Sequence, residues 1–203
     1  MDTKHKVFIS YHHQNEQNYK DELITQNELY GLFQDYSVGM DEIDDSDSDE
    51  TIRTIIRDEY IKDATVLILL CGKETKYRKF IDWELEAAMF DTEKNPKLGI
   101  LVISVPEIHQ SIRAGENEEK PSLSDTDGWF SISTREEYVK HYPYMPDRII
   151  DNFVNSVPIS VVEWNRIDNQ PGRLRYLIDK AFEKRTKCNY KNDRPMMGRN
   201  KTI

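Results

Sequence analysis

The chain has 203 residues, and its 28 lysines and arginines against 37 aspartates and glutamates give a formal net charge of −9. This length suits one domain, or one domain with a large insertion. The negative charge argues against a general nucleic-acid binder, whose affinity depends on neutralising phosphates. The two cysteines, Cys71 and Cys188, exclude a disulfide framework and a four-cysteine zinc site.

No apolar run approaches the roughly 18–20 residues that a membrane-spanning helix needs. Residues 1–6 lead into a short strand-like run instead of the apolar core of a signal peptide. We therefore expect a cytoplasmic protein that has neither a membrane nor a nucleic acid as its partner.

The first third of the chain predicts a strand, a helix and a short strand. Residues 6–11 are rich in β-branched and aromatic side chains and are followed directly by polar residues, which is typical of a buried strand that ends in a loop. Residues 18–32 have leucines and an isoleucine at helical spacing, ending near Gly31. Residues 33–38 are expected to form the short second strand.

The most acidic stretch, residues 40–50, has two interpretations. As a solvated loop it would also start a helix, because Asp47 or Ser48 can cap it and Glu50 suits the positive end of its dipole. As a calcium loop it would need the central glycine and the bidentate glutamate of an EF-hand, and it has neither. We favour the capped loop.

Two continuous apolar runs dominate the middle of the chain. Residues 64–71, ended by Gly72, and residues 98–105, stopped by Pro106, are typical of central parallel strands that are covered on both faces. Helices are expected over residues 52–60 and 80–90 from their apolar spacing.

Residues 107–155 show no sustained periodicity, and we interpret them as an insertion that contains a short helix over residues 134–141. Its aromatic residues would stack a nucleotide base or, as we favour, form a small core of their own. Residues 157–163 resemble a last strand, and a helix follows Pro171. The segment from Lys184 onward is basic and expected to fray.

The alternation of strands and helices predicts an α/β fold, a doubly wound, mostly parallel five-stranded sheet with an insertion before the last strand. We expect a single domain over residues 1–187, with the insertion at about 107–155, and a basic C-terminal tail over residues 188–203. No glycine-rich dinucleotide fingerprint or phosphate-binding loop is present. In the flavodoxin-like strand order 2-1-3-4-5, ligands bind beyond the carboxyl ends of strands 1 and 3.

Glu84 is the first candidate for chemistry. It lies within an apolar helical stripe formed by Ile81, Leu85 and Ala88. A carboxylate among apolar neighbours is rarely left without a partner or a task. The alternative is a glutamate paired with Arg78 or Lys79. We favour a functional role because this helix begins at the predicted crevice.

Other candidates follow the first strand. Ser10 and Tyr11 place a hydroxyl and a ring at its carboxyl end. His12 and His13 are adjacent and lack an evident third ligand, so we expect no metal site. Cys71 ends a buried strand and is interpreted as a core thiol. The chain contains no G-x-S-x-G turn, so we do not favour a serine hydrolase.

The chain resembles the TIR domain family. The segments that carry the resemblance are VFISY at residues 7–11, ATVLIL at 64–69, GKET at 72–75 and FIDWEL at 80–85. In that family the third strand leads to an aromatic-x-x-x-Glu segment, which Phe80 and Glu84 match, with Phe80 where tryptophan is usual. The chain is most similar to the TIR-like proteins of the bacterial Thoeris anti-phage systems, the ThsB type. This resemblance covers residues 4–105 well and residues 156–187 loosely.

The resemblance implies an enzyme that cleaves the nicotinamide–ribose bond of NAD+, its substrate, without a further cofactor, and forms a cyclic or otherwise modified ADP-ribose. A separate effector protein would receive this second messenger, a phage-derived trigger would activate the enzyme, and the chain would form a homo-oligomer. The implied catalytic residue is Glu84. The implied substrate-binding residues are Ser10, Tyr11, His12, Phe80 and Trp83. Residues 41–46 would correspond to the family's BB loop.

A second hypothesis is a non-catalytic TIR-like interaction module that scaffolds a partner. Glu84 at the expected spacing favours the enzyme, and Phe80 in place of tryptophan favours the module. The product's linkage does not follow from the sequence, because it depends on the shape of the pocket.

Overall fold

The computed structural model describes residues 4–37, 47–93, 95–125 and 129–202. Its strands are β1 (Lys6–Ser10), β2 (Gln34–Asp35), β3 (Val66–Cys71), β4 (Gly99–Ser104) and β5 (Ser160–Glu163). Its α-helices are α1 (His13–Tyr30), α2 (Asp49–Ile55), α3 (Lys79–Met89), α4 (Lys120–Leu123), α5 (Arg135–His141), α6 (Asp147–Val154), α7 (Trp164–Ile167) and α8 (Pro171–Lys184).

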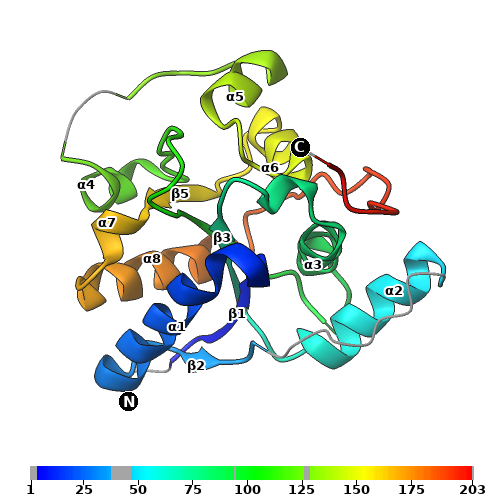
Figure 1. Ribbon diagram of the computed structural model, residues 1–203, viewed down its shortest axis with the longest axis horizontal. Helices are drawn as coiled ribbons and strands as arrows, with labels where there is room; N and C mark the ends of the chain where they lie inside the picture. The colour runs from blue at the N-terminus through cyan, green and yellow to red at the C-terminus, as the bar shows by residue number, and fades with distance from the viewer. Residues whose placement is uncertain (1–3, 38–46, 94, 126–128, 203) are drawn as a thin grey trace.

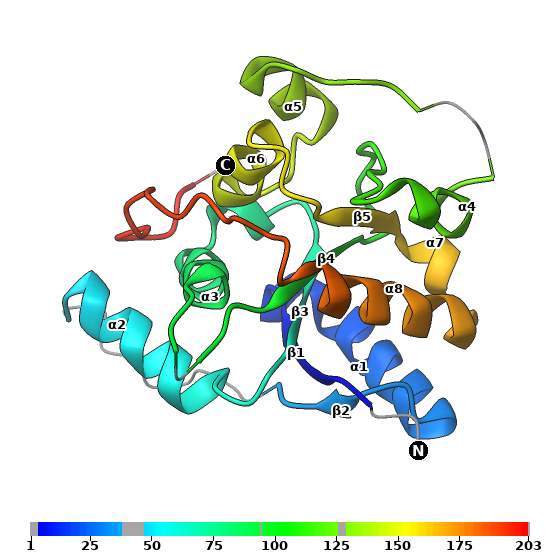
Figure 2. The same ribbon diagram turned by 180° about the vertical axis from the view of Figure 1, so that it is seen from behind.

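The five strands form one sheet in the order β2-β1-β3-β4-β5, and every pair is parallel. Helices α1 and α8 cover one face of this sheet, whereas α2, α3 and α6 lie on the other (Figures 1 and 2). The structure confirms the doubly wound α/β fold and its strand order. The switch point therefore lies between β1 and β3, where Ser10 pairs with Leu69.

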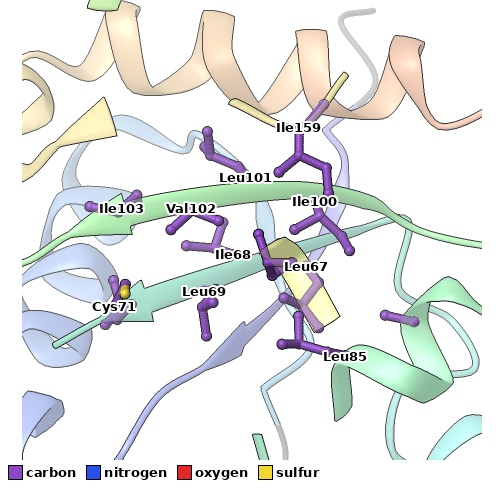
Figure 3. Close-up of a cluster of buried hydrophobic side chains, with 14 of the residues drawn as sticks. Leu67, Ile68, Leu69, Cys71, Leu85, Ile100, Leu101, Val102, Ile103 and Ile159 are labelled. Carbon is purple, nitrogen blue, oxygen red and sulfur yellow. The ribbon is translucent and has the colours of Figure 1, made fainter. Parts of the chain in front are cut away.

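The core forms around the two central strands, and every residue of β3 and β4 is buried. Figure 3 shows Leu67 and Leu69 of β3 beside Ile100 and Val102 of β4, with Leu85 projecting from α3 toward the sheet. Both faces of these strands are covered by helices, which explains why the two segments are apolar without alternation.

Several boundaries differ from the sequence prediction. Helix α1 begins five residues earlier than expected, because its first turn is polar and gives no apolar signal. It ends at Gly31, whose φ of 60° is the left-handed conformation that favours glycine. Ser48 caps α2 by accepting from the Thr51 N–H at 3.2 Å, as one of the two predicted caps. After α2 the chain continues as a π-helical turn, Ile56–Tyr60.

The insertion contains more structure than the sequence indicated. The short helix was correctly placed, and a capping box between Thr134 and Glu137 starts it. Helix α6 was not predicted. Tyr138 and Tyr142 pack against Phe153 of α6 at ring-centre distances of 5.6 and 5.1 Å, so these aromatic residues form the small core that we favoured.

The expectation that the tail frays is wrong for residues 190–201, which we call the C-terminal strap. It runs along α3 and toward α6 (Figure 2). The Tyr190 hydroxyl donates to the Leu98 carbonyl at 2.8 Å, and the Asn192 amide donates to the Glu86 carbonyl at 3.0 Å. Such hydrogen bonds are long-range in sequence, so composition alone did not reveal them. Within the described ranges, no helix has the length and apolarity required to cross a bilayer.

Substitution of Gly99 by alanine is expected to destabilise the fold. A Cβ at Gly99 would lie 2.0 Å from the backbone oxygen of Ala181, because α8 packs directly onto β4. Overpacking of this kind costs about 1–3 kcal/mol. Gly172→Ala is the matched control, since a Cβ there meets no atom within 4 Å. Chemical denaturation should show a lower free energy of unfolding for Gly99→Ala only, and equal values for the two variants would contradict this packing.

Candidate active site

The candidate site lies at the switch point, where β1 ends and α3 passes the carboxyl edge of the sheet. The Ser10 hydroxyl, on the last residue of β1, donates a hydrogen bond to Oε2 of Glu84 on α3. Ser10 is 0% exposed and Glu84 is 8% exposed. The structure therefore brings together two of the predicted site residues, which lie 74 positions apart in the chain.

Helix α3 carries two further buried carboxylates, and each is paired with an arginine. Asp82 accepts a bidentate hydrogen bond from Arg148 of α6, with both N–O distances at 3.1 Å. Glu86 accepts from Nε of Arg53 at 2.7 Å. The arginine partner of each carboxylate offsets part of the cost of its burial. For Glu86 burial still raises the pKa, and its Oε2 has no hydrogen-bond partner among the described residues.

Glu84 differs from these two carboxylates because it has no arginine partner among the described residues. Within the described residues it forms no ion pair, and a neutral hydroxyl is its hydrogen-bond donor. Arg78, which the alternative interpretation offered as a partner, instead forms an ion pair with Glu74. The ammonium of Lys79 lies over the rings of Phe80 and Trp83, 5.0 and 5.2 Å from their centres.

Burial without a cation raises the pKa of Glu84 from its ordinary value of 4.5 to about 8, and the Ser10 hydrogen bond opposes this rise. The carboxyl group is therefore mostly neutral at pH 7. A positively charged ligand placed beside it would lower this pKa and favour the anion. The site is thus suited to a cationic ligand or a reaction that develops positive charge.

Tyr11 and His12 flank this pair in the loop after β1. The Tyr11 hydroxyl donates to Gln17 at 2.9 Å, and its ring stacks on His13 with 4.4 Å between centres. His12 is half-buried, and burial, together with the nearby Arg78 charge, lowers its pKa, so its imidazole is neutral at pH 7. Its Nδ1 lies 4.0 Å from Oε2 of Glu74.

Phe80 and Trp83 lie on α3 with their rings in edge-on contact at 5.2 Å between centres. Trp83 is 2% exposed, and its indole N–H donates to the Met197 carbonyl of the C-terminal strap at 2.9 Å. Its hydrogen bond is thus with the strap and not with the Ser10–Glu84 pair. Substrate binding by these two residues stays a prediction.

Sequence reasoning missed Glu16, a buried carboxylate on the first turn of α1. It accepts from the His12 backbone N–H at 2.9 Å, and burial raises its pKa to about 7. A Cβ at Gly72 would lie 2.1 Å from Oε1 of Glu16, so glycine permits this close approach between α1 and the end of β3. The sequence did hold one signal for this contact: Glu16 follows His12 by four residues, so its side chain can reach back to the His12 N–H at the start of α1.

Two other expectations concern metals and thiols. The described ranges contain no group of three or more His, Cys, Asp or Glu side chains that would hold a metal ion. Burial raises the pKa of the Cys71 thiol to about 12, which agrees with a core thiol and not a nucleophile. The predicted BB-loop segment, residues 41–46, lies outside the described residues.

The site can now be compared with known proteins. A family model described as "Thoeris protein ThsB, TIR-like domain" matches residues 8–110. This range contains the last three residues of β1, the whole of β2, β3 and β4, and every predicted site residue. No curated protein matches the chain.

Glu84→Gln is expected to gain stability over wild type as the pH rises from about 4.5 to about 8. Below this window both folded and unfolded wild type carry the proton. Within it the unfolded state ionises while the folded state keeps its proton, so wild type loses free energy of unfolding, on the order of a few kcal/mol in total. Denaturation of both proteins at a series of pH values measures this, and a pH-independent difference would contradict the raised pKa.

Proposed function

The chain belongs to the TIR-like domain family of the Thoeris protein ThsB, a defence-related module, and from this membership we propose that it is an NAD+-cleaving enzyme. It breaks the nicotinamide–ribose bond and makes a cyclic or otherwise modified ADP-ribose, which a separate effector protein receives as a signal. The observation that carries this proposal is Glu84, a buried carboxyl group at the switch point that has no cation partner in the described residues.

The substrate supplies the positive charge that this site lacks. NAD+ carries a formal charge on its nicotinamide ring, and bond cleavage moves the electron pair to the ring nitrogen and leaves an oxocarbenium-like ribose. An ionised carboxylate beside the ribose stabilises that charge or forms a covalent adduct with it. Approach of the cation lowers the pKa of Glu84, and its proton passes to solvent.

The other predicted residues have supporting roles in this proposal. The Ser10 hydroxyl fixes the orientation of the Glu84 carboxylate through the hydrogen bond between them. Tyr11 and the neutral imidazole of His12 line the ribose and phosphate side of the substrate. Phe80 contributes aromatic surface on α3, and the buried Trp83 supports the Phe80 ring through their edge-on contact. A phage-derived trigger and homo-oligomer formation in the cytoplasm belong to the same proposal.

Glu84→Gln is expected to lower nicotinamide release from NAD+ by about 100-fold or more, because the neutral amide cannot stabilise the developing cation. Glu86→Gln is the matched control. It makes the same change two residues along α3, at a carboxylate that faces Arg53. Its activity should stay within a few-fold of wild type. Each purified protein is assayed by chromatography of the products, alone and with extract of phage-infected cells, after circular dichroism has confirmed folding.

Equal nicotinamide release from wild type and Glu84→Gln would contradict the catalytic role of Glu84. A folded wild type that turns over no NAD+ under either condition would favour the non-catalytic interaction module instead.

A further inference from the structure

A cavity lies on the opposite side of α3 from the Glu84 carboxyl group. It has a volume of about 730 Å³, is open to solvent, and is lined by the loop before α3, the start of α6 and the C-terminal strap. Asp82 of α3 lines it, and at 100° per residue Asp82 lies about 200° round the helix from Glu84. Small-molecule sites typically measure about 300–1,000 Å³, so this cavity is large enough for a nucleotide.

The walls of this cavity are positively charged although the chain as a whole carries −9. Its acidic lining residues are Asp82 and Asp147, and Asp82 is already paired with Arg148. The basic lining residues are Lys76, Arg78, Arg194, Arg199 and Lys201. Three of them already have a carboxylate partner: Arg78 pairs with Glu74, Arg194 with Asp151, and Lys201 lies 3.8 Å from Asp147. Such a concave cationic surface attracts an anion.

Three of these cations have binding capacity that the fold does not use. Arg199 is exposed and forms no ion pair with any described residue. Lys76 donates to the Pro143 carbonyl, a neutral acceptor. Nε of Arg78 is buried and has no hydrogen-bond partner in the described ranges. A buried donor without a partner requires an explanation, and a phosphate oxygen supplies the acceptor that it lacks.

The cavity also has an apolar wall. Pro146 lies at the start of α6, and Pro195, Met196 and Met197 come from the strap. Methionine side chains adapt their shape to flat apolar groups, so this wall is suited to a nucleotide base. A bare phosphate or pyrophosphate would leave it uncovered.

We propose that this cavity is a second ligand site, separate from the Ser10–Glu84 pair, that binds a nucleoside diphosphate. The cations hold the pyrophosphate, and the methionine and proline wall covers the base. The proposal is independent of NAD+ cleavage, because it rests on the cavity, its charge and the unused donors.

Binding of ADP, measured by titration calorimetry, tests the proposal. Wild type is expected to bind ADP more tightly than inorganic pyrophosphate and to show no binding of adenosine. Arg199→Glu should weaken ADP binding by at least about tenfold, because it reverses a charge that faces the phosphates. Lys62→Glu is the matched control, since it makes the same change of charge at an exposed residue outside the cavity. Its affinity for ADP should equal that of wild type.

A second variant tests the position of the site by filling it. Gly198 lines the cavity, and a Cβ there meets no atom within 4 Å, so Gly198→Trp is expected to fold normally and to block ADP. Hydrogen exchange of wild type should show protection of residues 194–201 when ADP is added.

Four results would overturn the proposal. In the first, wild type does not bind ADP at millimolar concentration. In the second, wild type and Arg199→Glu bind ADP with equal affinity. In the third, wild type binds pyrophosphate as tightly as ADP. The fourth is ADP binding lost in Glu84→Gln and kept in Arg199→Glu, which would place the nucleotide at the other site. The outcome of the nicotinamide assay affects none of them.

Discussion

The burial of three carboxylates on the single helix α3 is the constraint on which this site depends. A buried charge is tolerated when an opposite charge compensates for it. On α3, Asp82 forms an ion pair with Arg148, and Glu86 forms one with Arg53. The same helix leaves Glu84 with a serine hydroxyl. These two arginines hold α3 against the elements around it. The third carboxyl group therefore lies at the switch point, and no described residue carries a charge that neutralises it.

Much of the fold could be predicted because its core gives a local signal. The runs that became β3 and β4 are apolar throughout, since both faces of the sheet are covered. The insertion and the strap gave no such signal. Helix α6 buries the charged side chain of Arg148, which pairs with Asp82 on α3. The strap is held by hydrogen bonds to groups that are distant in sequence, such as the one from the Met197 N–H to Asp82. Neither interaction produces a periodic pattern, but α6 also buries Ile149, Ile150 and Phe153 at helical spacing, and sequence reasoning overlooked this signal.

Some residues of the candidate site could likewise be identified from the sequence, and others could not. Glu84 was identifiable because a carboxylate interrupts an apolar stripe, and Ser10 because it ends a strand at the switch point. The sequence did not identify Glu16 or the contact between Trp83 and Met197. Each of them depends on a close approach between segments that only the tertiary structure creates. The strap and the Glu84 carboxyl group lie on opposite sides of one helix, and α3 joins the two proposed ligand sites.

The central claim is that Glu84 is a buried carboxyl group without a cation partner among the described residues, and its own titration tests this most directly. The side-chain carboxyl resonances of uniformly labelled glutamate can be followed by NMR from pH 4 to 9, with Glu84→Gln identifying the signal. A midpoint near 8 agrees with the environment described above. A midpoint near the ordinary value of 4.5 would show that a charge compensates Glu84 and would contradict the account.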